Sequence, residues 1–152
     1  MEILENTLEC DLDAFLERPL FCFLGQVSDA GPRISPLWFH WEAGSIWTIA
    51  RLPDRSYPNR VRRDPRTAVA VVDFDPTVGS VEHVGMRGEA TLEPYDEDRA
   101  ERLLRPYLGD ETGEWPDMFR DLDPEDYRLL RFDPWTVVAR DQSYAVPPAM
   151  AE

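Results

Sequence analysis

The sequence contains no lysine, and only two histidines and two cysteines among its 152 residues. Cys10 and Cys22 are too few for a disulfide framework, and a buried thiol is the expected role of Cys22. His40 and His83 lack neighbouring carboxylates or cysteines at the spacing of a metal site, and His40 is expected to be structural. The sequence therefore predicts neither a metal centre nor a disulfide-rich secreted domain.

Long apolar runs are also missing. None approaches the roughly 20 residues that a membrane-spanning helix needs. The first residues, Met1 to Glu5, are acidic where a secretory signal is basic, so a cytoplasmic protein is expected. The net charge of −14 argues against nucleic acid as a partner. The absence of lysine fits either a biased nucleotide composition or a high-salt proteome, and the sequence does not separate the two.

No familiar catalytic motif is present. The chain has no Gly-x-Ser-x-Gly elbow, no Gly-Lys phosphate loop and no Gly-x-Gly-x-x-Gly fingerprint. Acid pairs such as Asp96–Glu97 and Asp110–Glu111 lie in loops or at helix starts, where capping explains them. We therefore name no catalytic residue, and any chemistry is expected to come from a bound cofactor.

What the sequence does have is a cluster of arginine. Asp54 and Asp64 are the only acids in residues 51–66, which hold six of the sixteen basic residues. The six are Arg51, Arg55, Arg60, Arg62, Arg63 and Arg66. The planar guanidinium group binds phosphate or carboxylate oxygens two at a time, which makes an anion site one interpretation of the cluster. A solvated helix face is the other interpretation.

The local pattern around the cluster favours the anion site. Ser56 can cap a helix that continues through Val61 and ends before Pro65. Arg55 and Ser56 would then lie at a helix N-terminus, where unpaired amides attract anions, with Arg60 about one turn further on. This placement suits one small phosphate-type ligand.

Five stretches are rich in β-branched or aromatic residues and are separated by turn residues. The predicted strands are residues 20–27, 33–41, 45–50, 67–74 and 80–92. Tight links between the first three predict an antiparallel meander. Residues 127–131 and 136–140 are predicted to close the sheet as a pair of strands around Asp133 and Pro134.

Helices are predicted at residues 11–18, from Asp96 to Gly109, and for a short stretch around residues 115–122. No repeat or linker is visible. The order of elements predicts a mainly β or α+β barrel-like domain, because the regular strand–helix alternation of a parallel sheet is absent. Residues 1–140 are expected to form this single domain, and residues 141–152 a tail.

Four motifs occur in a familiar order. They are Pro-Arg-Ile-Ser-Pro-Leu-Trp-Phe from Pro32 to Phe39, Ile46-Trp47-Thr48, Arg62-Arg63-Asp64-Pro65-Arg66, and His83-Val84-Gly85-Met86-Arg87-Gly88. From about Phe15 to Pro94, the chain resembles the pyridoxamine 5′-phosphate oxidase-like family of flavin-binding split barrels. The resemblance implies a six-stranded antiparallel split β-barrel with short flanking helices. It also implies a homodimer that binds a flavin or deazaflavin in clefts between its subunits.

Carried onto this sequence, the resemblance implies a set of cofactor-binding residues. Arg33, Ser35, Pro36 and Leu37 would lie along the flavin ring, with Thr48 approaching from the next strand. Arg51, Arg55, Ser56 and Arg60 would hold the phosphate. Tyr57 replaces the lysine of the family's phosphate motif, and His83 falls where related oxidases have a glutamine.

The function implied by the resemblance is that of an oxidoreductase that uses FMN and acts on an unknown small organic substrate. FMN is preferred because the acidic tail of a deazaflavin would need a longer basic groove than this chain offers. The C-terminal Arg-x-His segment that binds pyridoxamine phosphate has no counterpart, so that substrate is not expected. The alternatives are a non-catalytic protein that binds flavin, deazaflavin or haem, and a dimeric barrel that serves only as an interaction module.

Overall fold

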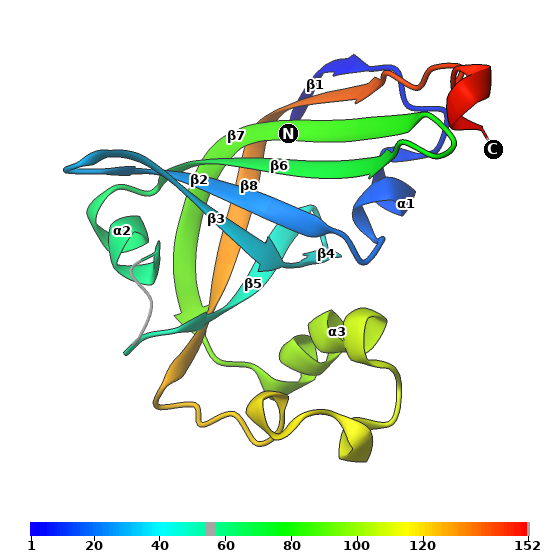
Figure 1. Ribbon diagram of the computed structural model, residues 1–152. Helices are drawn as coiled ribbons and strands as arrows, with labels where there is room; N and C mark the ends of the chain where they lie inside the picture. Colours follow the sequence, from blue (N-terminus) through cyan, green and yellow to red (C-terminus); the bar gives the residue numbers. More distant parts are fainter. Residues whose placement is uncertain (54–56, 152) are drawn as a thin grey trace.

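The computed structural model describes residues 1–53 and 57–151. In these residues, eight strands form one sheet in the order β3-β2-β6-β7-β8-β5-β4, and β1 pairs with β8 (Figure 1). The strands are β1 (Glu2–Asn6), β2 (Phe21–Ser28), β3 (Gly31–Trp38), β4 (His40–Glu42), β5 (Ser45–Arg51), β6 (Arg66–Asp75), β7 (Ser80–Pro94) and β8 (Tyr127–Asp141). The helices are α1 (Leu12–Leu16), α2 (Tyr57–Arg63) and α3 (Glu97–Leu108).

The predicted fold class is confirmed. Neighbouring strands pair antiparallel along the whole sheet path, and short helices flank the barrel. Two short strands, β1 and β4, add to the six that the resemblance implied. Strand β1 pairs parallel with β8, from Glu2 opposite Thr136 to Asn6 opposite Ala139. Its side chains are mostly exposed, so the sequence has no alternation of apolar and polar residues that would predict this strand.

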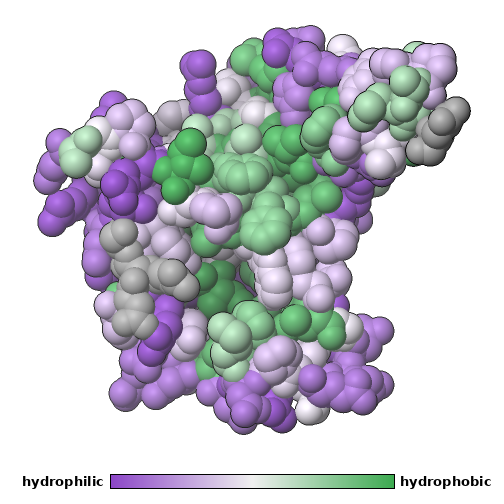
Figure 2. Space-filling view, viewed as in Figure 1, coloured by the Kyte–Doolittle hydropathy of each residue, from purple (hydrophilic) through white to green (hydrophobic). Residues whose placement is uncertain are grey.

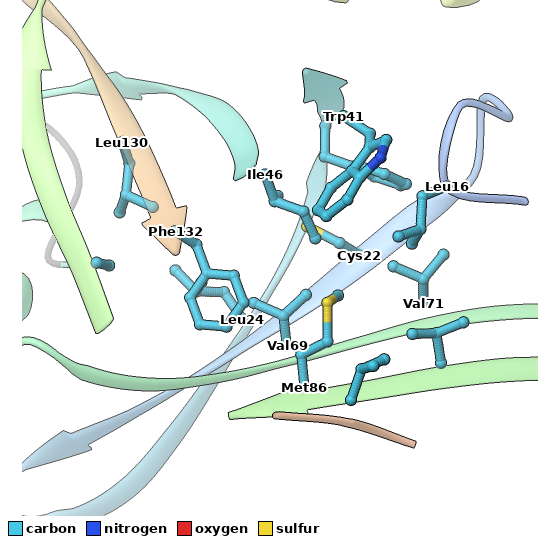
Figure 3. Packing of buried hydrophobic residues seen from close by; sticks show 14 of the residues in the cluster. Leu16, Cys22, Leu24, Trp41, Ile46, Val69, Val71, Met86, Leu130 and Phe132 are labelled. Atoms are coloured by element: carbon cyan, nitrogen blue, oxygen red, sulfur yellow. The ribbon is translucent and has the colours of Figure 1, made fainter. Parts of the chain in front are cut away.

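The barrel interior is filled by alternate side chains of the strands. Leu24, Val69, Met86 and Phe132 are almost completely buried and meet at the centre (Figure 3). Each such side chain contributes about 1.5–3 kcal/mol through burial. Cys22 is buried in the same cluster as expected, and burial raises the pKa of its thiol to about 12.

The predicted strand at residues 33–41 is broken at Phe39, between β3 and β4. The hydroxyl of Tyr107, on α3, accepts a hydrogen bond from the Phe39 amide at 3.2 Å. It also lies within donating distance of the carbonyls of Leu20 (2.6 Å) and Phe39 (3.2 Å). A side chain from a distant helix thus replaces the ladder partners of Phe39, which local sequence does not reveal.

The prediction of two closing strands around Pro134 is wrong, because β8 runs unbroken from Tyr127 to Asp141. The strand passes Pro134 through a register shift between Arg87 and Gly88 of β7. A Cβ at Gly88 would lie 2.1 Å from the Asp133 carbonyl oxygen, so only glycine allows this close approach.

Helix α3 builds a second, smaller core on the outside of the barrel. Leu103, Leu104 and Trp115 are buried there, with Trp38 and Ile49 packed against them. The helix is capped as predicted by Asp96, which accepts a hydrogen bond from the Arg99 amide at 3.0 Å. The helix predicted around residues 115–122 is replaced by two 3-10 turns, at Thr112–Glu114 and Asp117–Phe119.

The residues that follow β8 are bonded to the turn between β6 and β7. The amides of Gln142 and Tyr144 donate to the carbonyls of Val81 (2.8 Å) and Gly79 (2.9 Å), at the turn between β6 and β7. A 3-10 turn follows at Pro148–Met150. Within the described residues, the helices are all too short or too polar to cross a membrane.

Candidate cofactor site

The structure divides the arginine cluster into two kinds of residue. Arg63 pairs with Asp29 at 3.3 Å, and Arg66 pairs with Asp64 at 2.6 Å. The bond from Arg66 holds the pKa of the Asp64 carboxyl at about 2. Arg62 is exposed and lies 3.4 Å from the Asn59 side chain. For these arginines, the solvated-face interpretation is the better one.

Arg60 is different, because it turns inward from α2 toward β2 and β3. Its Nε donates to Oε1 of Gln26 at 2.9 Å, and a terminal nitrogen lies 3.4 Å from Oγ of Ser35. Gln26 is only 4% exposed, and its own amide donates to the Tyr57 carbonyl at 3.0 Å. These two neutral oxygens orient the guanidinium group toward the face of β3.

Arg33 provides a second positive charge close to the first. It lies opposite Gln26 in the pairing of β2 with β3. Burial and the charge of Arg33 together lower the pKa of Arg60 below its ordinary value. Among the described residues, no carboxylate lies within ion-pair distance of Arg33. Two like charges held this close repel each other, and an anion between them would relieve the repulsion.

Arg33, Ser35 and Leu37 share one face of β3, because alternate side chains of a strand point the same way. Their partners across the ladder are Gln26, Leu24 and Cys22, which are all buried. The structure thus brings three of the four residues predicted on this strand to the face of Arg60. Pro36 points to the opposite face.

Two of the residues predicted to bind the cofactor, Thr48 and Tyr57, have side chains in the core. Thr48 is completely buried between Ile46 and Ala50 in the β5 sequence, and its hydroxyl has no partner in the described part of the chain. Tyr57 is 6% exposed, and its hydroxyl donates to the Ile49 carbonyl at 2.7 Å. The structure therefore does not place the side chain of either residue at the surface where a ligand would bind.

The remaining predicted phosphate ligands cannot all be placed. Arg51 is exposed at the end of β5, opposite Tyr127 of β8. Arg55 and Ser56 lie outside the described residues. Gln26 was missed as a site residue, although it is a polar side chain at an inward position of a predicted strand, which is a signal that could have identified it.

His83 lies on the other side of the sheet from Arg60. It occupies an outward-facing position of β7, which is three strands away from β3 in the sheet. Its Nε2 lies 3.2 Å from Oε1 of Gln142. Within one chain, the structure therefore does not bring His83 together with Arg33, Ser35 and Arg60.

His83 borders an apolar hollow of about 550 Å³ on the outer face of the sheet. Small residues of β2, β6 and β7 line the hollow, namely Gly25, Ala68, Ala70 and Gly85. Phe23 and Ile34 also line it and are 39% and 72% exposed. Figure 2 shows apolar side chains gathered over this side of the molecule. We call this surface the outer apolar face.

The residues described hold no group of three or more His, Cys, Asp or Glu side chains that could bind a metal ion. The candidate site instead consists of two guanidinium groups, a hydroxyl and a half-buried leucine along one strand. This donor set suits a phosphate joined to a flat, partly apolar molecule.

Comparison with known proteins identifies the family of the chain. The family model of pyridoxamine 5′-phosphate oxidase matches residues 8–140. The chain belongs to the pyridoxamine 5′-phosphate oxidase family. No curated protein matches the chain in sequence.

Solved structures show that the family fold extends over nearly the whole chain. A conserved hypothetical protein, Rv2991 from Mycobacterium tuberculosis, has a TM-score of 0.71 at 19% identity, covering 93% of this chain and 89% of its own. A structure named F420 reductase has a TM-score of 0.65 at 23% identity, covering 86% and 98%. An FAD-binding protein from Mycobacterium smegmatis has a TM-score of 0.58 at 16% identity, covering 85% and 92%.

Proposed function

We propose that this member of the pyridoxamine 5′-phosphate oxidase family is a flavin-dependent oxidoreductase. In this proposal it binds FMN between two copies of the chain and acts on a small organic substrate. When bound, the flavin supplies the chemistry of hydride and electron transfer. The chain's own residues hold the cofactor and shape the space beside its ring.

The observation that carries the proposal is the Arg33–Arg60 pair. Gln26 and Ser35 fix Arg60 by two hydrogen bonds, so little side-chain freedom remains to be lost when an anion binds. The phosphate of FMN carries close to two negative charges near neutral pH. It would accept charge-assisted hydrogen bonds from both guanidinium groups and remove their mutual repulsion.

The flavin ring is assigned to the face of β3 beyond this pair. Leu37 and Ser35 are half-buried there and follow Arg33 at alternate positions, so a ligand with its phosphate at Arg33 would extend along the strand. Strand residues rise about 3.3 Å each, so the distance from Arg33 to Leu37 is about 13 Å. That span suits a molecule with a phosphate at one end and a fused ring system at the other.

The dimer in this proposal rests on the outer apolar face. Monomeric proteins rarely expose a large connected apolar surface. A second copy of the chain, covering this face, would bring its own His83 toward the sheet of the first copy. His83 would then lie at the contact between the two copies, on the face of the sheet opposite Arg60.

A deazaflavin is the second candidate cofactor. The structural neighbour named F420 reductase favours it, since 98% of that chain is covered. A non-catalytic protein that binds flavin or haem in the same place is the alternative to an enzyme.

The absorbance spectrum of freshly purified protein tests the proposal, followed by mass measurement of the ligand released on denaturation. FMN, with bleaching by a nicotinamide donor, is the expected result. Release of a deazaflavin would replace FMN as the cofactor, and colour without bleaching would favour the binding protein. Colourless protein that neither flavin stabilises against heat would contradict the proposal, because ligand at 100 times its Kd adds about 2.7 kcal/mol.

A further inference from the structure

A half-open hollow of about 260 Å³ lies between α3 and residues 112–122, on the outside of the barrel. Helix α3 and this segment project together from one end of the molecule (Figure 1). The buried residues that line the hollow are apolar, namely Ala100, Leu104 and Trp115. The exposed residues that line it include Glu97, Arg120 and Asp121. The hollow therefore has an apolar floor and a charged rim.

The charge around the hollow is strongly negative. Residues 95–126 hold twelve Asp or Glu and only four Arg, so their net charge of −8 is more than half of the chain's −14. Burial raises the pKa of Tyr95, which also lines the hollow, to about 12, and the carboxylates of Glu97 and Glu101 add to this shift. The same field that disfavours a negative charge on Tyr95 attracts a cation to the hollow.

Part of this negative charge is balanced within the protein. Arg105 pairs with Glu101 at 3.2 Å, and Arg120 pairs with Asp117. Among the described residues, no arginine lies within ion-pair distance of Glu97 or Asp121. These two carboxylates belong to the two walls of the hollow, one on α3 and one on the segment that follows it. Their charges are available to a ligand between the walls.

The lining suits a cation of diffuse charge better than a metal ion. Over the part of the chain that the structure describes, no three acidic, His or Cys side chains come close enough to hold a metal ion. Tyr95, Trp115 and Phe119 instead add aromatic rings to the hollow. Aromatic rings attract cations, and several rings together recognise quaternary ammonium groups. A cavity of about 150 Å³ holds benzene, so the hollow has room for a methylated ammonium group.

We propose that this hollow binds a small organic cation of the alkylated ammonium type. The alkyl groups of the ligand contact the apolar floor and the aromatic rings. Glu97 and Asp121 balance the positive charge from the two walls. The site lies within one chain and needs neither the flavin nor a second copy, so it goes beyond the proposed function.

Calorimetric titration of the full chain with choline and with 3,3-dimethylbutan-1-ol tests this inference. The alcohol has the shape of choline with a carbon atom in place of the charged nitrogen. Choline is expected to bind about tenfold more tightly than the alcohol, because only choline interacts with the rings and carboxylates as a cation. Its binding should also weaken as sodium chloride is added. Equal affinity for the two compounds would overturn the inference.

Exchange of the two carboxylates for amides tests their role. The double variant Glu97→Gln, Asp121→Asn should bind choline about 3–10-fold more weakly and leave the alcohol unaffected. Asparagine accepts the φ of 53° found at Asp121. Asp98→Asn is the matched control, since Asp98 shares the first turn of α3 with Glu97 but does not line the hollow. An equal loss in this control would show attraction to the acidic surface as a whole and would overturn the site.

NMR on the unaltered protein keeps the test independent of how the variants fold. Choline should shift the amide signal of Gly113, which lines the hollow, and not that of Gly31 in the turn between β2 and β3. A Gly113 signal that stays in place at saturating choline would contradict the proposal. The same shift with calcium chloride at equal affinity would also contradict it, because the site would not distinguish an organic cation.

The result can be separated from the proposed flavin function. Arg60→Ala should bind choline as tightly as the unaltered protein, since Arg60 does not line this hollow. Binding of choline without binding of FMN would leave the cation site standing and remove the proposed function. Binding of FMN with no response to choline would overturn the cation site alone.

Discussion

Arg60 and Gln26 are joined by a hydrogen bond of 2.9 Å from the guanidinium Nε to the amide Oε1. Gln26 is buried, and its amide nitrogen is occupied by the Tyr57 carbonyl, so its oxygen is directed at Arg60. The neutral side chain of Gln26 therefore fixes the guanidinium group of Arg60. Burial lowers the pKa of Arg60 below its ordinary value. The hydrogen bond to Gln26 fixes the orientation of the guanidinium group beside β2 and β3.

Gln26→Glu should separate orientation from charge. The carboxylate keeps the shape of glutamine but competes with a phosphate for Arg60. The Kd for FMN is expected to rise by about tenfold, equivalent to about 1.4 kcal/mol. Riboflavin, which has no phosphate, should bind as before. Fluorescence titration with both ligands checks this, and a parallel loss of both would indicate damage to the fold.

Tyr107→Phe should destabilise the protein. The variant keeps the ring on Trp38 but leaves the Phe39 amide without its 3.2 Å acceptor. The free energy of unfolding is expected to fall by about 1–3 kcal/mol, the usual cost of an unsatisfied buried group. Urea denaturation measures it. Tyr144→Phe is the matched control, since Tyr144 is 47% exposed, and an equal effect of both variants would contradict the role given to Tyr107.

Glu42 should make stability depend on pH below about 4.5. The hydrogen bond from Arg102 is the main reason that the pKa of this carboxyl is held at about 2, against an ordinary value of 4.5. Hydrogen bonds with His40 and Arg99 lower the pKa further. A depressed pKa adds stability that is fully present above 4.5 and is lost as pH falls toward 2.

Glu42→Gln is therefore expected to lower the free energy of unfolding by about 1–3 kcal/mol at pH 7 and by little near pH 2. The control is Glu101→Gln, because the one ion pair of Glu101 within the described residues is the partly exposed i,i+4 pair with Arg105 at 3.2 Å. A difference of less than about 0.5 kcal/mol is expected for it. Loss of stability in Glu42→Gln that is equal at both pH values would contradict the electrostatic account.

The proposed dimer can be tested on the outer apolar face. Ile34 is 72% exposed in one chain, so Ile34→Asp should cost the monomer little. In a dimer that buries this face, it would place a carboxylate in an apolar contact, and the dissociation constant should rise by more than about tenfold. Val78→Asp is the control, since Val78 is 65% exposed at the β6–β7 turn. Sedimentation should give twice the 17.6 kDa chain mass for the unaltered protein and for the control. A monomer in every case would contradict the dimer.

Much of the fold could be predicted because local signals agreed with it. Aromatic and β-prone residues marked β2, Asp96 and Gly109 marked the ends of α3, and Pro65 marked the end of α2. The wrong predictions concern features that depend on contacts between residues far apart in the sequence. Tyr107 breaks the strand at Phe39, and Gly88 allows β8 to continue past Pro134.

The candidate site was predicted in part for similar reasons. Charge clustering found Arg60 but could not show that Arg63 and Arg66 are paired with Asp29 and Asp64. Strand alternation could place Ser35 and Leu37 on one face, but not the side chain of Thr48, which faces the barrel interior. Such outcomes depend on packing between elements, which a linear pattern does not contain.

The most direct measurement compares FMN with riboflavin in Arg60→Ala, with Arg62→Ala as the matched control on the same helix. Loss of one charged hydrogen bond should weaken FMN binding by about 1.5–3 kcal/mol and leave riboflavin unchanged. Arg62→Ala should change neither, because Arg62 is exposed and, within the part of the chain that the structure describes, its side chain is bonded to Asn59 alone. If Arg60→Ala binds FMN as tightly as the unaltered protein does, the phosphate does not lie at the Arg33–Arg60 pair, and the account of the site is wrong.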